Sequence, residues 1–192
     1  MAITTTQKIA SAARSLLEKE GAEGVTMRRV ASAVGITPMA LYRHYSNRKG
    51  LLKALANTGF EELAEKLASL RLTGRVERQL LMILDVFLDH AFEKPRLFEL
   101  MFLTRRDGAR QFPEDFRARR SPTANVSADV IAGAMETGYF RKDDVWEIVF
   151  ETGALMQGLV MLYVGGRVAL PPERFRAFCH RSFGRYLNGI RS

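Results

Sequence analysis

The sequence predicts an all-α protein, and three observations lead to this prediction. Apolar residues recur at spacings of three and four along most of the 192-residue chain, whereas the strict alternation typical of strands is scarce. Glycine, proline and threonine stand where helices would start and stop. Hydrophobic residues make up 47% of the chain, enough for a sizeable core without disulfides or metals. About nine helices are predicted, and they span roughly residues 4–20, 27–34, 38–44, 48–70, 74–93, 95–103, 113–138, 143–166 and 172–190.

The first three helices have marked boundaries. Gly21 and Gly24 are expected to end the first helix, because glycine readily adopts the left-handed cap conformation. Thr26 and Thr37 are well placed as N-caps of the next two helices, and the proline after Thr37 suits a first helical turn. Gly35 between these short helices favours a tight turn.

Later boundaries are marked by proline and glycine. Pro95 begins a helix, and the pairs at 165–166 and 171–172 separate the last two helices. The weakest stretch is 104–125, which we expect to form either a mobile loop or a helix broken by Pro122. Its several arginines are interpreted as a solvated loop, with an anionic effector or a position beside DNA as the alternatives.

Composition restricts the class of protein. No uninterrupted apolar run of about eighteen residues occurs, which argues against a membrane span. The N-terminal residues lack the charged start, apolar core and small-residue cleavage site of a signal peptide, so we expect none there. The single cysteine, Cys179, cannot form an internal disulfide, and we interpret it as a small core or interface residue. We therefore expect a cytoplasmic protein with no membrane partner and no cofactor.

The net charge of +8 is concentrated at the N-terminal end. Residues 1–50 hold eight basic and three acidic side chains, a net charge of +5, which leaves +3 for the remainder. A basic end on a nearly balanced body indicates a polyanionic partner at that end. Charge alone does not distinguish DNA from RNA or from a membrane surface.

Residues 25–52 have the pattern of a helix-turn-helix, in which a supporting helix and a tight turn position a second helix for the major groove. The supporting helix is expected to bury Val30, Ala31 and Val34. The second is expected to bury Leu41 and Tyr45, which are four residues apart and share a face. The outward positions combine hydroxyls, a cation, an aromatic ring and small apolar groups that could contact thymine methyls. These positions are Thr37, Pro38, Met39, Ala40, Tyr42, Arg43 and His44.

This stretch resembles the N-terminal domain of the TetR family of regulators. The resemblance rests on four features: Gly24-Val25-Thr26, Ala31 followed by Gly35-Ile36, Leu41-Tyr42-Arg43-His44-Tyr45, and Arg48 before Leu51-Leu52. It covers about forty-five residues, while the remainder resembles the family only in length and all-helical character. The resemblance implies a three-helix DNA-binding domain over 1–50, joined by a long helix to a helical effector-binding and dimerisation domain over 51–192.

The resemblance also implies DNA contacts at matching positions. Those residues are Thr26, Arg28, Thr37, Pro38, Met39, Tyr42, Arg43, His44 and Arg48. Thr37, Pro38, Met39 and Arg43 would face bases, although Met39 and Ala40 could instead be packing residues. Phosphates would be bound by Thr26, Tyr42, His44 and Arg48, and Arg28 would reach the backbone or a base edge. Arg48 replaces the family's usual lysine and Tyr45 its usual phenylalanine. Arg29 is expected to be solvated or paired with an acidic neighbour.

The last two helices are predicted to form a four-helix dimer interface, as the resemblance implies. Symmetric half-sites on DNA require a dimer whose recognition helices lie roughly 34–36 Å apart. The candidate interface residues are Leu155, Leu159, Leu162, Phe178, Phe183 and Tyr186. Their alternative role is packing in the core of a single chain.

The middle helices are rich in aromatic residues and methionine, and the resemblance implies a chamber for a hydrophobic small molecule there. The candidate lining residues are Phe60, Phe87, His90, Met101, Phe102, Phe116, Phe150 and Gln157. For any single one of them, core packing is the ordinary explanation, and only the group as a whole suggests an apolar effector.

These observations predict a ligand-responsive transcriptional regulator, a homodimeric repressor released from a palindromic operator when the effector binds. The alternative is a DNA-binding adaptor or structural protein without an effector. A small all-helical enzyme is disfavoured because His44, His90 and His180 lack the spacing of a metal site and no phosphate-binding glycine loop is present.

Overall fold

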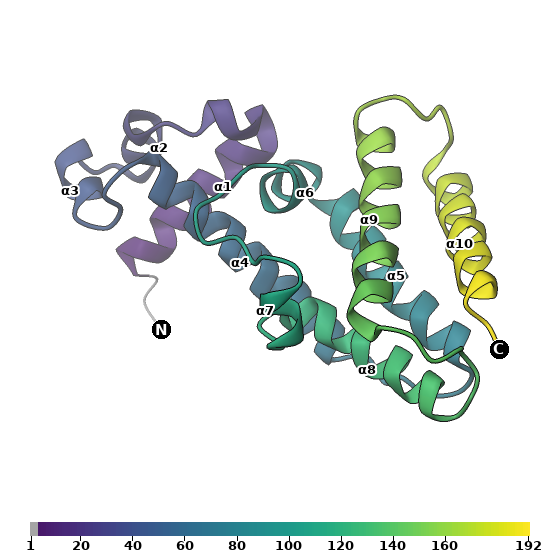
Figure 1. Ribbon diagram of the computed structural model, residues 1–192. Helices are drawn as coiled ribbons and strands as arrows, with labels where there is room; N and C mark the ends of the chain where they lie inside the picture. The colour runs from purple at the N-terminus through teal and green to yellow at the C-terminus, as the bar shows by residue number, and fades with distance from the viewer. Residues whose placement is uncertain (1–3) are drawn as a thin grey trace. The chain divides into compact units, whose positions relative to one another are not determined.

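The computed structural model describes residues 4–192, and within that range the chain forms ten helices, shown in Figure 1. They are α1 (Thr5–Gly24), α2 (Met27–Val34), α3 (Pro38–Tyr42), α4 (Arg48–Ala68), α5 (Val76–Glu93), α6 (Pro95–Phe102), α7 (Glu114–Arg117), α8 (Pro122–Glu136), α9 (Val145–Val164) and α10 (Pro172–Gly189). No named strand occurs among the described residues. The all-α prediction is confirmed.

The helix predicted over 113–138 is two helices, α7 and α8, so the predicted number is one too low. Pro122 occupies the first turn of α8 and cannot extend a helix that precedes it, because it has no N–H to donate and its ring clashes with the carbonyl four residues earlier. Arg119 between the two helices has a left-handed φ of 56°. The alternative of a helix broken at Pro122 is therefore confirmed.

The first helix begins and ends as its sequence indicates. Thr4 caps α1 through a reciprocal bond with Gln7, in which each residue's side chain accepts from the other's backbone N–H. Gly21 has φ 74° and ψ −175°, so it interrupts the regular helix, and one further turn continues to Gly24. A residue with a Cβ would be strained at that φ.

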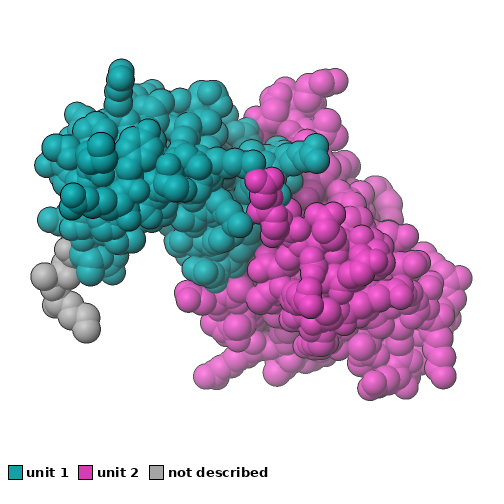
Figure 2. Space-filling view, turned by 60° about the vertical axis from the view of Figure 1, so that its left-hand side comes forward, with its two compact units in different colours: residues 1–62, 93–106 teal, residues 63–92, 107–192 magenta. Residues whose placement is uncertain are grey.

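The described chain divides into two compact units, coloured separately in Figure 2. One contains the residues up to Glu62 together with Glu93–Arg106, and the other contains Leu63–Phe92 and Asp107–Ser192. The first unit therefore holds α1, α2, α3 and α6 with most of α4. The second holds most of α5 with α7, α8, α9 and α10.

In the first unit, α1 packs against α2 and α6. Its inner stripe of Ile9, Ala13 and Leu17 is completely buried, as expected for residues four apart on one face. The backbone N–H of Leu97 at the start of α6 donates to Glu18 of α1 at 3.2 Å. An orphan donor of a helix N-terminus is thereby satisfied by a carboxylate.

The first unit also contains a three-residue ion cluster centred on Glu62 of α4. Arg14 of α1 donates two hydrogen bonds to this carboxylate, and Lys94 donates a third at 2.9 Å. Each side chain is only about a quarter exposed. The hydrogen bond from Arg14, with a smaller contribution from Lys94, lowers the pKa of Glu62 from 4.5 to about 2.

In the second unit, α10 buries Phe175, Cys179, Phe183 and Leu187, again four residues apart. Tyr163 of α9 stacks on Phe175 with centroids 4.1 Å apart. Cys179 is fully buried, and desolvation raises the pKa of its thiol to about 11. The interpretation of this cysteine as a core residue is confirmed.

We predict that Glu62→Gln lowers stability at neutral pH by roughly 1 kcal/mol, after discounting the shift in pKa for solvent screening, or about 2–4 °C in Tm. Because the pKa is lowered on folding, the stabilisation is complete above pH 4.5 and is lost as pH falls from 4.5 towards 2. Thermal melts at pH 7, 4 and 2.5 should therefore show the wild type and the variant converging. Glu61→Gln is the matched control, since Glu61 is exposed and has no ion pair within the described residues. A difference in Tm that stays constant with pH would contradict the assignment.

Candidate nucleic-acid interface

The caps of α2 and α3 fix the helix-turn-helix. Thr26 caps α2 by accepting from the N–H of Arg29 at 3.3 Å, and Thr37 caps α3 by accepting from Ala40 at 3.2 Å. Gly35 closes α2 in the left-handed conformation, with φ 76°. The proline after Thr37 lies in the first turn of α3. These boundaries agree with the predictions, except that α3 ends at Tyr42.

The interior of this motif differs from the prediction, because Val25 and Met27 are buried as well. Val30, Ala31 and Leu41 are buried, with at most 1% of each residue exposed. Val34 and Tyr45 are only half-buried. The small core leaves most of α3 on the surface.

The outer side of α3 is unusually apolar for a free surface. Met39 is 71% exposed and Tyr42 is 48% exposed. Thr37 and Pro38 are exposed beside them. Large apolar groups gathered on one exposed side of a helix indicate a surface that is covered by a partner.

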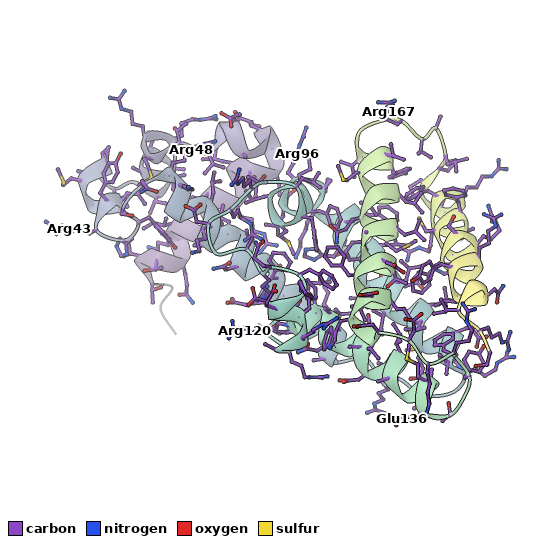
Figure 3. The ribbon with its side chains drawn as sticks, in the orientation of Figure 1. Arg43, Arg48, Arg96, Arg120, Glu136 and Arg167 are labelled. Carbon is purple, nitrogen blue, oxygen red and sulfur yellow. The ribbon has the colours of Figure 1, made fainter. Side chains whose placement is uncertain are left out.

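Cations flank this surface. Arg28 and Arg43 are exposed, and neither makes an ion pair within the described residues. Figure 3 shows Arg43 projecting away from the rest of the structure at the end of α3. Two uncompensated guanidinium groups beside an exposed recognition helix suit a phosphate backbone.

Other polar and charged side chains of the helix-turn-helix are paired within the chain. Arg29 donates to both carboxylate oxygens of Glu20, at 2.6 and 2.5 Å, and this bond lowers the pKa of Glu20. The prediction that Arg29 pairs with an acidic neighbour is confirmed. His44 lies 3.1 Å from the hydroxyl of Thr6, measured from Nδ1, so one ring nitrogen joins α1 to the segment after α3.

Arg48 has a structural role that was not predicted. Its Nε donates to the carbonyl of Val25 at 2.8 Å, and Nη2 donates to the carbonyl of Ala22 at 2.7 Å. Nη2 also lies 3.1 Å from the carboxylate of Glu23. The guanidinium therefore joins the start of α4 to the connection between α1 and α2. The fork of arginine makes this double contact possible, and lysine could not reproduce it.

Thr6, Glu20 and Glu23 are the residues of this region that the sequence did not identify. Thr6 and Glu23 lie 38 and 25 positions from their partners, so no local spacing reveals these contacts. Of the nine predicted DNA contacts, seven are exposed. Thr26 and Arg48 are half-buried.

Two family models match the chain. The model described as bacterial regulatory proteins, tetR family, matches residues 4–55, which contain α1, α2 and α3. The model described as tetracyclin repressor-like, C-terminal domain, matches residues 80–185. The chain belongs to the TetR family. It is therefore a DNA-binding transcriptional regulator of the helix-turn-helix type.

Individual relatives are more distant. An uncharacterised HTH-type transcriptional regulator, YobS of Bacillus subtilis, is 25% identical over 114 residues, which cover 59% of this chain and 60% of that protein. The fatty acid degradation regulator FadR of Bacillus halodurans is similar in structure, with a TM-score of 0.72 and 17% identity over 96% of this chain and 98% of the other. A TetR variant of Acinetobacter baumannii in complex with minocycline has a TM-score of 0.69 and 18% identity over 98% and 96%. These structures establish the TetR fold.

The predicted effector residues lie in both compact units. Phe60 and Phe102 pack edge to face in the first unit, with centroids 5.2 Å apart, and Met101 is buried beside them. In the second unit Phe116 and Phe150 pack edge to face at 5.7 Å. The remaining candidates in the second unit are the buried His90 and the half-buried Phe87 and Gln157. The structure adds Phe112, which stacks on Phe150 at 4.4 Å.

Five of the six predicted interface residues keep accessible surface. Leu162 is 46% exposed, and the half-buried residues are Leu155, Leu159, Phe178 and Tyr186. Phe183 is only 6% exposed, because its position on the inner stripe of α10 places it in the core of the single chain. The structure therefore assigns Phe183 to intramolecular packing.

We predict that Arg48→Ala destabilises the protein by about 1–3 kcal/mol in the absence of DNA, since the carbonyl of Val25 loses its donor and the carbonyl of Ala22 keeps only the N–H of Val25. Urea denaturation should show a lower midpoint for this variant. Arg48→Lys should restore part of the stability, because it keeps one donor. Tyr42→Ala is the control, since the exposed Tyr42 makes no hydrogen bond within the described residues and its loss should leave the midpoint unchanged. Equal midpoints for Arg48→Ala and wild type would contradict the structural role.

Proposed function

We propose that this TetR-family chain is a homodimeric repressor that leaves a palindromic operator when a small hydrophobic effector binds residues 51–192. The observation that carries the DNA-binding part is the exposed, uncompensated surface of α3, with Met39 and Tyr42 uncovered and Arg43 unpaired among the described residues. Residues 1–50 then form the DNA-binding domain.

The groups on α3 divide into two kinds. Met39 and Thr37 lie at its start, where the recognition helix of a helix-turn-helix meets base edges. Tyr42, Arg43 and His44 lie at its end and would bind the phosphate backbone, with Arg28 contributing a further cation from α2. Thr26 and Arg48 would approach the backbone where α2 and α4 begin.

We propose a dimer because a single recognition helix on one half-site binds weakly. A palindromic operator has two half-sites, which match the two subunits of a twofold-symmetric dimer. The exposed side of α9 supports it. This helix is strongly apolar along its length, but less than a third of it is buried in the single chain. Leu155, Leu159 and Leu162 would be covered by a second copy, together with Phe178 and Tyr186 of α10.

A small-molecule effector is proposed from the aromatic groups on both units and from the relatives. One structural neighbour is a complex with minocycline, and another is named for the regulation of fatty acid degradation. Each of two separate aromatic clusters would by itself suit an apolar effector, Phe60–Phe102 in the first unit and Phe112–Phe116–Phe150 in the second. The alternative, an adaptor without an effector, would show no ligand-dependent change in operator affinity.

We propose that effector binding changes DNA binding through α4, at Gly59. A Cβ added there would lie 2.5 Å from Sδ of Met101 and 3.2 Å from the side chain of Leu97, both in α6. The two helices can approach this closely only because Gly59 has no side chain. A shift of α6 would therefore be transmitted to the helix that starts at Arg48. An effector acts in this way only if it binds the two arrangements unequally.

Selection of genomic fragments by the purified protein tests DNA recognition, and we expect recovered fragments to share an inverted repeat. Tyr42→Ala should weaken binding to all recovered fragments about 5–30-fold, the loss of one phosphate contact. Met39→Ala should change which fragments are preferred, because it alters a base-facing position. Gel-shift titration at fixed salt measures both effects. Recovery of fragments without a common motif would refute sequence-specific DNA recognition. An unchanged operator affinity of Tyr42→Ala would refute the phosphate contact assigned to Tyr42.

Gly59→Ala tests the proposed coupling between α6 and α4. The added methyl should displace α6 from α4 and reduce operator affinity at least tenfold without touching DNA. Adding Met101→Ala makes room for the methyl and should restore affinity. Gly133→Ala in α8 is the matched control, because a Cβ there meets no atom within 4 Å. Fluorescence anisotropy with labelled operator gives the affinities, and circular dichroism confirms that each variant is folded. Unchanged affinity and effector response in Gly59→Ala would exclude this route.

A further inference from the structure

A hydrogen bond between Thr6 and His44 joins the first turn of α1 to the segment that follows α3. The hydroxyl of Thr6 lies 3.1 Å from Nδ1 of His44, although 38 positions separate the two residues. Figure 1 shows that the start of α1 and the end of α3 belong to the same part of the structure. Both side chains are exposed, so this contact is not a consequence of core packing.

The backbone holds both partners in place. Thr6 lies between Thr4 and Gln7, whose reciprocal bonds cap α1. The N–H of His44 donates to the carbonyl of Leu41 at 2.9 Å, and the side chain of Leu41 is completely buried. Since these bonds already fix the two backbones, the bond between the side chains chiefly determines how the imidazole ring is turned.

The other ring nitrogen of His44, Nε2, makes no hydrogen bond within residues 4–192. The two ring nitrogens point in widely different directions, so the bond at Nδ1 turns Nε2 away from α1. Tyr42 and Arg43 are exposed just before His44 at the end of α3. An exposed ring nitrogen therefore stands beside a phenol and a guanidinium, both of which can donate to an anion.

The proton on the ring decides whether Nε2 can join them. A phosphate oxygen only accepts, and a neutral imidazole carries one N–H and one bare nitrogen. The neutral ring can donate through Nε2 only when Nδ1 is the bare nitrogen, which then needs a donor of its own. The rotatable hydroxyl of Thr6 can be that donor. The opposite tautomer would turn a lone pair of Nε2 towards the phosphate.

Resting on the phosphate contact of His44 in the proposed function, we infer that Thr6 is a positioning residue for DNA binding. Its hydroxyl donates to Nδ1 of His44 and holds the ring with the N–H of Nε2 turned towards the phosphate backbone. The partner of one ring nitrogen commonly sets the proton on the other in this way. Thr6 acts through the ring and does not itself touch DNA.

Removal of the hydroxyl tests the inference in the full-length protein. Thr6→Val keeps the branched shape and loses the donor, whereas Thr6→Ser keeps the donor. The probe is a DNA duplex of about 30 base pairs and arbitrary sequence at low salt, because a phosphate contact does not depend on base sequence. We expect Thr6→Val to weaken binding about 3–10-fold and Thr6→Ser to bind within about twofold of the wild type. Thr5→Val is the matched control, since the exposed Thr5 makes no side-chain hydrogen bond among the described residues.

A double-mutant cycle separates this role from a direct contact between Thr6 and DNA. In a His44→Ala background, Thr6→Val should cause no further loss, because no ring remains to be oriented. A further loss there would overturn the inference. If His44→Ala weakens binding but Thr6→Val does not, the inference is wrong and the phosphate contact stands. If His44→Ala binds as tightly as the wild type, the phosphate contact in the proposed function is itself wrong, and the inference fails with it.

The tautomer of His44 gives a readout that a purely structural role would not change. Long-range proton–nitrogen NMR of the DNA complex, with nitrogen-15 in the histidines, shows which ring nitrogen carries the proton at about pH 8. His44→Gln identifies its signals among those of the three histidines. We expect the proton on Nε2, and a chemical shift of Nδ1 that changes in Thr6→Val but not in Thr6→Ser. A proton on Nδ1, or an Nδ1 signal unaffected by Thr6→Val, would overturn the inference. Circular dichroism establishes that each variant is folded.

Discussion

The guanidinium of Arg48 joins the segments on which the DNA-facing surface depends. It is the first residue of α4, where the positive end of the helix disfavours a cation. Its guanidinium donates to the carbonyl oxygens of Ala22 and Val25, at the end of α1 and before α2, and its charge is paired with the carboxylate of Glu23. Helix ends expose carbonyls that need donors, and one rigid fork satisfies two of them. The turn after α1, and with it the direction of α2 and α3, is therefore tied to α4.

The same helix, α4, also makes two other contacts that hold the first unit together. Three turns further along α4, Gly59 allows α6 to approach closely, and Glu62 binds Arg14 and Lys94. A displacement of α6 would meet steric resistance at Gly59 and electrostatic resistance at Glu62. Both resistances act on α4, so the proposed route from α6 to the helix that begins at Arg48 would act beside the direct packing of α1 against α6 and α2.

The sequence was sufficient for features that arise from local chemistry. The caps at Thr26 and Thr37, the left-handed turn at Gly35 and the buried stripe of α2 all follow from residues within four positions of one another. Features that require distant partners were not predictable. The donors of Arg48 face carbonyls that any residue type could supply, 23 and 26 positions away. Phe183 belongs to a stripe that could face a second copy or the interior, and only the packed chain shows that it faces inward.

The apolar character of α9 has two physical explanations. It is the one helix among the described residues that is long and apolar enough to cross a membrane, which is a weak indication by itself. A spanning helix would have to place Glu147 and Glu151 in or near lipid, where carboxylates are costly. A protein interface instead tolerates them, because an opposite charge can be supplied by the surface that covers the helix. Since α10 runs beside α9 with three arginines that have no ion pair among the described residues, a second copy would supply that charge in the same contact that covers the apolar residues. Covering by a second copy therefore accounts for both the hydropathy of α9 and the charges beside it, whereas a membrane accounts for the hydropathy alone.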